Sequence, residues 1–334
     1  MSLDQQNIIS HLKKKIAYSH TISKIKVLET HISWILLTGS FVYKIKKELK
    51  FGNVLDFSKL SLRKKFCQKE VMLNKYLCGN MYQCVVKIIE KNGIFRIADL
   101  NEKGRPLEYA VKMVEIPQKF RMDNLVKAGK INEKMINSLT EIIIQFHNRA
   151  PSNKKISTFA QPKIMKRKFN ENFLTISKIG KIDPIFECKL NSFLKNKSVL
   201  FYQRIRESKI RDIHGDLYLK NIFIINNKFY LYDRIEFNDS LRYADVVEDV
   251  AHLAMDLDFH QRADLAECFI SQYIKKSNDK KIKNLVYFMM CFKACVRAKV
   301  SLFRANEVYD KKKIIYEKEA RKHLKLARKY VELF

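Results

Sequence analysis

The pattern of apolar residues changes once along this chain, and that change constrains the fold more than any other feature. Before the proline-containing segment 114–118, short stretches rich in β-branched and aromatic residues are separated by turns. After it, apolar residues recur at spacings of three and four, as in 131–147. The first pattern is typical of strands and the second of helices. The sequence therefore predicts an α+β, bilobal fold: a small antiparallel-sheet lobe over residues 1–115 and a larger, mostly helical lobe over residues 116–334.

The small lobe is expected to contain a five- or six-stranded antiparallel sheet with one main helix. Its predicted elements are a helix over 5–18, three strands within 25–45, a helix over 59–77 with Ser58 as N-cap, and strands over 85–90, 94–100 and 107–113. The predicted elements of the large lobe are helices over 131–147, 183–195, 198–208 and within 243–331, and a hairpin with its tight turn at Asn226 and Asn227. Functional side chains are then expected from both lobes.

Residues 211–225 carry the polar side chains best suited to chemistry. His214, Asp216 and Asn221 follow the order H-x-D-x-x-x-x-N, and Asp233 comes after the next apolar run. In phosphoryl transfer, such an aspartate accepts the proton of the attacking hydroxyl, while amide and carboxylate oxygens hold the magnesium ion that bridges the nucleotide phosphates. The same residues also fit a polar turn between two strands, with His214 packed in the core.

A lysine and a glutamate in the small lobe complement this set. Strand alternation places Lys44 on the face opposite Tyr43 and Ile45. Glu70 lies among apolar residues on one face of the predicted helix over 59–77, where a carboxylate is costly unless it is paired. We expect Lys44 to be its partner and to hold the nucleotide phosphates. The alternative is that Glu70 lies at the edge of the apolar stripe, in water.

Several segments carry a family resemblance when they are taken together. They include H-G-D-L-x-L-x-N at 214–221 and D-V-A-x-L-x-M-D at 249–256. The others are 38–47, 51–58, 67–74, 233–239 and 296–300. This set resembles the aminoglycoside phosphotransferase-like family, within the protein-kinase-like fold, and in it a bacterial branch of uncharacterised predicted phosphotransferases.

The resemblance implies a kinase that uses ATP and Mg²⁺ to phosphorylate a hydroxyl group of a small molecule. The roles it implies are Asp216 as catalytic base, Asn221 and Asp233 as magnesium ligands, Lys44 as phosphate lysine with Glu70 as its partner, Met113 and Glu115 in the hinge that meets adenine, and His214 and Asp249 as supports of the catalytic loop. Some relatives carry a second nucleotide-binding domain with G-x-x-x-x-G-K-[ST]. No such motif occurs here, so the need for a partner domain stays open, as does the oligomeric state.

Two positions depart from the family pattern. The turn that would cover the nucleotide, residues 29–33, has no glycine, so Thr30 or Ser33 would have to supply the hydrogen-bond donors. Tyr218 stands where relatives in this branch more often have histidine. The first departure favours the alternative that the chain binds a nucleotide or partner without turnover, as a pseudokinase does.

A third departure is Arg234, which follows the metal aspartate where relatives have a small or apolar residue. It is expected to pair with Glu236 or Asp239, or to reach an anion of the substrate. Arg234 and Glu236 are therefore candidate substrate residues. The cation of Arg234 also favours the pseudokinase alternative.

Further candidates for substrate binding lie in the large lobe. An acidic set would suit an amine, and a basic set, with Arg297 at its centre, would suit a phosphate or carboxylate. These sets are Asp256, Asp258 and Asp264, and Arg242, Arg297, Lys299 and Arg304. Arg297 also fits an ion pair with Asp245 or Glu248. The acceptor therefore stays open.

Composition sets limits on other functions. The net charge of +30 suggests an anionic partner such as nucleic acid, but the lysines are spread along the whole chain without an arginine-rich arm. A nucleic-acid or ribosome-associated function is therefore the third alternative. Seven cysteines without a C-x-x-C pair argue against a disulfide framework and a cysteine zinc site. No run of about 18 apolar residues occurs, so no membrane segment is expected and the chain is interpreted as cytoplasmic.

Overall fold

The computed structural model describes residues 5–177, 184–308 and 311–334, and the chain forms two compact units. The first unit comprises Met1–Gln118 and a return segment, Tyr230–Asp239. The second comprises Lys119–Phe229 and Ser240–Phe334. The return segment carries Asp233 and lies within the first unit, although the sequence division at residue 115 assigned it to the other lobe.

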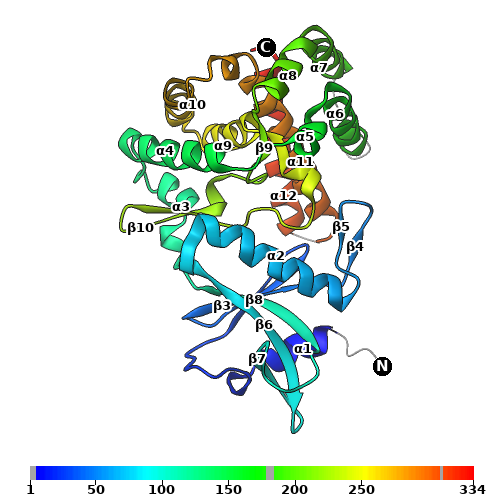
Figure 1. The fold of residues 1–334 in the computed structure, drawn as a ribbon, viewed down its shortest axis with the longest axis vertical. Helices are drawn as coiled ribbons and strands as arrows, with labels where there is room; N and C mark the ends of the chain where they lie inside the picture. The colour runs from blue at the N-terminus through cyan, green and yellow to red at the C-terminus, as the bar shows by residue number, and fades with distance from the viewer. Residues whose placement is uncertain (1–4, 178–183, 309–310) are drawn as a thin grey trace. The chain divides into compact units, whose positions relative to one another are not determined.

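The first unit is built on a six-stranded antiparallel sheet in the order β1-β2-β3-β8-β6-β7, which confirms the predicted sheet (Figure 1). Its strands are β1 Lys26–Glu29, β2 Ser33–Leu37, β3 Phe41–Lys46, β6 Tyr82–Lys91, β7 Ile94–Asp99 and β8 Glu108–Val114. Strand β3 is central, and Lys44 is opposite Ile35 of β2 and Val111 of β8. The short strands β4 Lys50–Phe51 and β5 Leu55–Asp56 pair separately.

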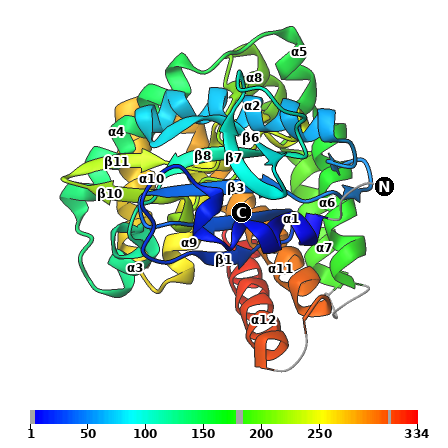
Figure 2. The same cartoon turned by 90° about the horizontal axis from the view of Figure 1, so that it is seen from below.

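The two faces of this sheet are covered by different helices. Helix α1, Gln5–Leu12 (Figure 2), contributes apolar side chains to a core that includes Tyr43 and Ile45. Helix α2, Leu60–Cys78, contacts β6 and β8 on the other face. Because side chains alternate along a strand, Lys44 and Lys46 point toward α2. The sheet thus separates an apolar face from a face that carries charge.

Two predicted helix ends in this unit are wrong. The helix expected over 5–18 ends at Leu12, and only a 3-10 turn, Lys15–Ala17, follows. Ser58 does not cap α2, because its amide and hydroxyl both donate to Asp56 Oδ1, at 3.1 and 2.6 Å. The serine therefore closes the turn before the helix, and Lys59 occupies the N-cap position without a side-chain cap.

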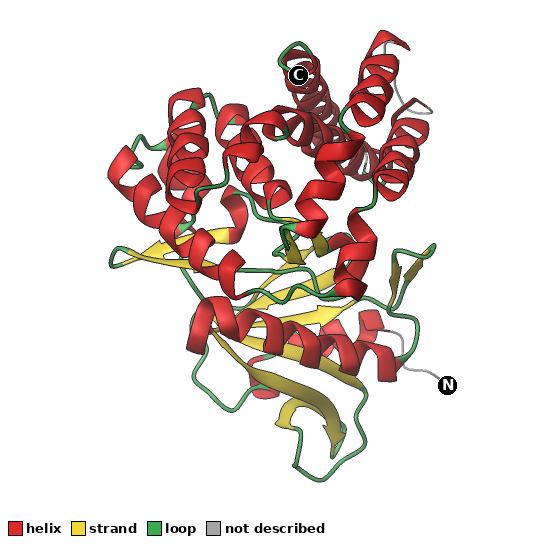
Figure 3. Ribbon diagram, turned by 45° about the horizontal axis from the view of Figure 1, so that its top comes forward, coloured by secondary structure: helices red, strands yellow, loops and turns green. Residues whose placement is uncertain are grey.

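Helices make up most of the second unit (Figure 3). They are α3 Met122–Lys127, α4 Glu133–Arg149, α5 Lys154–Ser157, α6 Pro162–Ser177, α7 Pro184–Asn196, α8 Ser198–Arg206, α9 Val247–Phe259, α10 Ala263–Ser277, α11 Val286–Asn306 and α12 Lys311–Val331. Helices α11 and α12 run side by side (Figure 2). The expected start of α7 at residue 183 lies outside the described residues. Among the described residues, no helix is long and apolar enough to cross a lipid bilayer.

Short strands place the loops of the second unit. Strand β10, Ile222–Ile225, and β11, Lys228–Leu231, form the predicted hairpin, and Asn226 and Asn227 have φ of 48° and 61°, as its tight turn requires. Strand β9, Ile210–Asp212, pairs with β12, Tyr243–Asp245. The sequence predicted a helix from residue 243, which is wrong for these three residues. Three residues are too few for periodicity to distinguish a strand from a helix.

Candidate active site

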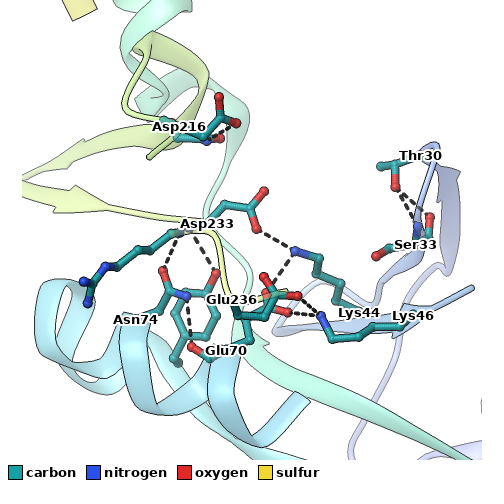
Figure 4. A network of polar contacts seen from close by, with 12 residues as sticks. Thr30, Ser33, Lys44, Lys46, Glu70, Asn74, Asp216, Asp233 and Glu236 are labelled. Carbon is teal, nitrogen blue, oxygen red and sulfur yellow. Dashed lines mark hydrogen bonds and ion pairs between the residues drawn. The ribbon is translucent and has the colours of Figure 1, made fainter. Parts of the chain in front are cut away.

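The predicted ion pair between Lys44 and Glu70 is present in the first unit (Figure 4). Lys44 Nζ donates to Glu70 Oε1 at 2.9 Å, and Glu70 is fully buried at 0% exposure. Burial alone would raise the pKa of Glu70, but Lys44 and Lys46 together lower it to about 2. Both charges are thus retained in the interior, because each partner stabilises the other.

A second buried lysine, Lys46, lies beside this pair and was not predicted as a site residue. Its Nζ donates to Glu70 Oε2 at 2.7 Å and also forms an ion pair with Glu236, and its exposure is 1%. Burial raises the pKa of Glu236, which contacts one lysine, whereas Glu70 contacts two. The sequence feature that could have identified Lys46 is its position two residues after Lys44, which places both lysines on the same face of β3.

Asp233 belongs to the same cluster. Its Oδ1 accepts a hydrogen bond from Lys44 Nζ at 2.6 Å (Figure 4). Its backbone has φ of 62°, in the left-handed region, which costs a residue other than glycine on the order of 1 kcal/mol. Such backbone strain persists only where surrounding contacts impose it, and it concentrates at functional sites.

Two side chains hold the backbone around Asp233. Asn74 Oδ1 accepts from the amide of Arg234 at 3.0 Å, and Asn74 Nδ2 donates to the carbonyl of Glu70 at 2.9 Å. Tyr82 Oη accepts from the amide of Asp233 at 3.3 Å. The glutamate and the aspartate are therefore connected through Asn74 as well as through Lys44. Sequence reasoning missed Tyr82 in this role, although Asn74 lay within a segment that carried the resemblance.

Replacing Tyr82 with phenylalanine should weaken this support without opening a large cavity. The amide of Asp233 loses an acceptor worth about 1 kcal/mol, so nucleotide binding in the presence of Mg²⁺ should weaken roughly fivefold. A fluorescence titration with a nucleotide analogue measures the change. Tyr202→Phe, at a half-exposed position in the second unit, is the matched control. Equal affinity of the Tyr82 variant and the control would contradict the assigned contact.

The two carboxylates expected to pair with Arg234 each contact a lysine. Glu236 pairs with Lys46, and Asp239 accepts from Lys69 Nζ at 2.7 Å. Arg234 itself is 5% exposed. The two pairs attach the return segment to β3 and α2.

The hinge residues expected to meet adenine lie at the end of β8. Met113 pairs with Val42 on one side and Tyr82 on the other. The amide of Glu115 donates to the carbonyl of Ser40 at 3.0 Å, and its carboxylate accepts from the amide of Gly39 at 2.7 Å. The backbone amide and the carboxylate of Glu115 thus both hold the turn between β2 and β3. Adenine contacts from the hinge would fall to the peptide groups after this amide.

The glycine-free turn before β2 is closed by its own side chain. Thr30 Oγ1 donates to the carbonyl of Ser33 at 2.9 Å and accepts from the amide of Ser33 at 2.9 Å (Figure 4). Ser33 is 0% exposed. The hydroxyl of Thr30 is therefore used within the turn, whereas the buried hydroxyl of Ser33 has no hydrogen-bond partner among the described residues.

In the second unit, Asp249 braces the loop that carries Asp216. Its carboxylate accepts from the amide of His214 at 2.8 Å, from the amide of Gly215 at 2.9 Å and from His147 Nε2 at 3.2 Å. Gly215 has φ of 86°, which a side chain would strain. Burial raises the pKa of Asp249, but the His147 hydrogen bond and the nearby charges outweigh it and leave the pKa lowered. His214 is fully buried beside this carboxylate, so it lies where the loop is supported.

Asp216 and Asn221 lie together on this loop. Asn221 Nδ2 donates to the carbonyl of Asp216 at 3.0 Å and approaches its Oδ2 at 3.4 Å. Within the described part of the chain, the amide oxygen of Asn221 accepts no hydrogen bond, which leaves it for a ligand. The 3-10 turn Leu219–Asn221 begins where the amide of Leu219 donates to buried Asp256 at 2.9 Å.

The acidic set suggested for an amine does not form one surface. Asp256 supports the loop through Leu219, and burial raises its pKa to about 6. Asp258 accepts from Tyr330 at 2.6 Å and pairs with Lys329 at 2.8 Å. Exposed Asp264 pairs with Arg262. The first of these carboxylates is structural, and the others already have cationic or hydroxyl partners.

The basic set is also divided. Arg242 pairs with Asp212, and Lys299 contacts Asn172. The pairs suggested for Arg297 are wrong. Their carboxylates are taken by other cations: Asp245 by Arg204 at 2.6 Å, and Glu248 by Lys293 at 3.0 Å. Arg297 instead lies over the ring of Tyr218, with its guanidinium carbon 4.6 Å from the ring centroid.

The residues present can serve a magnesium-bound nucleotide. In the described residues, no group of three or more His, Cys, Asp or Glu side chains is arranged to hold a metal by itself. Magnesium in nucleotide sites needs no such cage, because one or two protein oxygens, phosphates and water complete its octahedron. The carboxylate of Asp233 and the amide oxygen of Asn221 have the required chemistry, each on its own unit.

Comparison with known proteins gives relatives at the sequence level but no described activity. No protein-family model matches the chain. Uncharacterized proteins of Mycobacterium tuberculosis and Mycobacterium bovis are 32% identical over 289 residues, which is 85% of this chain and 56% of each relative. The chain thus spans about half the length of the curated relatives that it matches.

Solved structures show the fold. The chain is similar to an ethanolamine kinase of Plasmodium vivax, with a TM-score of 0.51, 12% identity and coverage of 92% of this chain and 84% of the other. It is similar to a choline kinase of Cryptosporidium parvum, with a TM-score of 0.50, 11% identity and coverage of 93% and 90%. It is also similar to APH(2")-IIia in complex with GDP and kanamycin, with a TM-score of 0.52, 13% identity and coverage of 93% and 95%.

Proposed function

Because the chain has the aminoglycoside phosphotransferase-like form of the protein-kinase-like fold, we propose that it is a phosphotransferase that moves the γ-phosphate of ATP to a hydroxyl group of a small molecule. The observation that carries this proposal is the cluster of Lys44, Glu70 and Asp233, in which a lysine connects a buried helix glutamate to a part-exposed aspartate with a left-handed backbone. An ion pair between a strand lysine and a helix glutamate, beside a metal aspartate, is the arrangement that phosphoryl transfer requires.

Each residue has a part in the proposed step. Lys44 has three N–H donors, of which Glu70 and Asp233 take two, so the third is left for a phosphate oxygen. Asp233 and Asn221 would hold magnesium, which neutralises the charge of the phosphates. Asp216 would take the proton of the acceptor hydroxyl while the hydroxyl oxygen forms a bond to the γ-phosphorus. The bond from that phosphorus to the β–γ bridging oxygen breaks, and ADP leaves.

The positions of the supporting residues favour this assignment. Asp216 is part-exposed, with 35% of its side chain accessible, whereas Asp249 and His214 behind it are fully buried. The base is thus reachable by an acceptor while its loop is held from the interior. The return segment brings Asp233 to Lys44 within the first unit.

A screen for ATP-dependent phosphorylation tests the function. The purified chain would be incubated with ATP, Mg²⁺ and a metabolite extract, and new phosphate esters would be detected by mass spectrometry. We expect at least one hydroxyl compound to gain a phosphate in the wild type and none to gain it in Asp233→Asn. A phosphorylation pattern that is the same for both proteins would contradict the assignment of Asp233.

A second candidate function is nucleotide binding without turnover. It is favoured by the glycine-free turn before β2, where the hydroxyl of Thr30 bonds to the backbone of Ser33 and is not free for a phosphate. Magnesium-dependent binding of ATP, with no product from any acceptor in the screen and no ATP hydrolysis, would support this function. Turnover of any acceptor would exclude it.

A further inference from the structure

Among the described residues of the second unit, the buried arginines are Arg204, Arg242 and Arg297, and one of them lacks the carboxylate partner that the other two have. Arg204 pairs with Asp245 and Asp279, and Arg242 pairs with Asp212. Within the described residues, Arg297 makes no ion pair, and its Nε is buried without a hydrogen-bond partner. A buried guanidinium group without a counter-ion is costly, so its retention needs a reason.

A buried histidine near Arg297 also lacks hydrogen-bond partners. The ring of Tyr218 contacts both side chains: it lies under the guanidinium of Arg297, and the ring of His252 is stacked on it at 5.4 Å with an interplanar angle of 8°. His252 is 2% exposed, and among the described residues neither of its ring nitrogens has a hydrogen-bond partner. Burial, with Lys293 and Arg297 nearby, lowers its pKa well below the usual value, so the ring is neutral and its N–H is available as a donor.

This group lies next to Asp216. His252 Nδ1 is 3.8 Å from Asp216 Oδ1, too far for a hydrogen bond. Burial opposes the charge of Arg297, but Tyr218, Asp216 and Asp256 outweigh it and raise its pKa. The guanidinium group therefore stays charged while none of these groups forms an ion pair with it.

A second cation acts at the same place. Lys220 is half-buried on the turn that carries Asn221, and it makes no ion pair in the described residues. Neither Lys220 nor Arg297 has a carboxylate counter-ion among the described residues, so a bound anion would stabilise both charges.

We propose that Arg297 and Lys220, with the His252 ring, form an anion subsite beside Asp216, and that the acceptor carries a phosphate or carboxylate group in addition to the hydroxyl that is phosphorylated. The part of this inference that concerns the acceptor rests on the proposed function. An arginine fork suits a phosphate or carboxylate, with two parallel hydrogen bonds. The same cations would repel an amine, so ethanolamine-like and aminoglycoside-like acceptors would be disfavoured.

The first test measures anion binding without ATP, and so does not depend on phosphoryl transfer. Inorganic phosphate would be titrated calorimetrically into the full chain at several salt concentrations. We expect Arg297→Met to weaken phosphate binding about tenfold to a hundredfold, the loss of one or two charged hydrogen bonds. The matched control is Arg304→Met, on the same helix, whose guanidinium also lies over a tyrosine ring, that of Tyr316.

Two further variants keep the test decisive if Arg297→Met does not fold. Arg297→Lys keeps the charge without the fork and should lose less affinity than Arg297→Met. Lys220→Met changes a half-buried turn residue and should weaken binding severalfold. Far-UV circular dichroism and thermal unfolding would check each variant. Equal loss of phosphate binding in the Arg297, Lys220 and Arg304 variants would show general attraction to a basic surface and overturn the subsite.

The second test compares acceptors. Glycerol, glycerol 3-phosphate, glycerate and ethanolamine differ in the charged group beside their hydroxyls. We expect an anionic member to have a kcat/KM at least tenfold above those of the neutral and amine members, a preference that Arg297→Met removes. Transfer to ethanolamine with no anion preference would overturn the subsite and keep the proposed function. Phosphate binding that requires Arg297, with no transfer to any acceptor, would keep the subsite and remove the function.

Discussion

Replacing Asp216 with asparagine is expected to lower kcat by two to four orders of magnitude, with little change in nucleotide affinity. The substitution removes the group proposed to take the acceptor proton, and general-base catalysis contributes about 10² to 10⁴ to a rate. Asparagine has nearly the same shape, and the loop is held by Asp249 through the amides of His214 and Gly215, which the substitution leaves intact. The fold should therefore be preserved.

Steady-state kinetics on the acceptor found in the screen would measure this effect. Asp264→Asn, an exposed aspartate paired with Arg262 in the same unit, serves as the control and should keep wild-type kcat. Nucleotide binding of Asp216→Asn would be measured by titration to separate binding from chemistry. A variant that keeps full turnover would show that another group takes the proton, and the assignment of Asp216 would be withdrawn.

Replacing Lys46 with methionine is expected to destabilise the first unit by about 3 to 5 kcal/mol, because removing one partner of a buried ion pair leaves an uncompensated charge. Lys46 is 1% exposed and contacts both Glu70 and Glu236. Without it, Glu236 has no cation in contact. The return segment that carries Asp233 would also lose one of its attachments to β3, so nucleotide binding should weaken together with stability.

The cost of this substitution should depend on pH. Burial raises the pKa of Glu236 above 4.5, and removal of Lys46 removes the contact that opposes the rise. The folded chain of the variant then binds a proton more readily than the unfolded chain. The loss in free energy of unfolding should therefore be smallest below a pH of about 4.5 and should grow as the pH rises through the pKa of Glu236 in the folded variant.

Urea unfolding of the wild type and Lys46→Met at several pH values would measure both effects. Lys47→Met, one residue further on the chain, removes a lysine whose partner Glu29 is 57% exposed, and it should cost less than about 1 kcal/mol. The double variant Lys46→Met/Glu236→Gln should recover part of the loss, because no unpaired carboxylate is left at that position. Similar losses in free energy of unfolding for the Lys46 and Lys47 variants would show that the buried contacts of Lys46 with Glu70 and Glu236 are not important for stability.

Most of the fold was accessible from the sequence because it is governed by local patterns. The breaks in the β-branched run between residues 25 and 45 gave three strands, and the pair Asn226 and Asn227 gave the hairpin turn, since both depend on neighbouring residues alone. The pair of Lys44 and Glu70 followed from two periodicities and from the cost of a buried carboxylate. The predicted helix ends were less accurate. Ser58, for example, forms a hydrogen bond with the carboxylate of Asp56 and does not cap the helix.

Other features depend on contacts between residues far apart in the chain. Sequence spacing did not identify the cation that pairs with each buried carboxylate, because several lysines and arginines were possible partners. The structure pairs Glu236 with Lys46, Asp245 with Arg204 and Glu248 with Lys293. The tertiary fold decides which charges meet, and so which remain unpaired. Arg297 became informative only when its expected partners proved to be occupied.

The sequence by itself determined the α+β class, most of the helices and strands and the candidate residues for phosphoryl transfer, because periodicity specifies local structure and residue type specifies the available chemistry. Only the tertiary structure decided that the segment with Asp233 belongs to the first unit and that Lys46 holds it there. It also decided that Arg297 lies over the ring of Tyr218 and makes no ion pair within the described residues. The physical reason is that burial and pairing are properties of residues brought together from distant positions, and no local pattern encodes them.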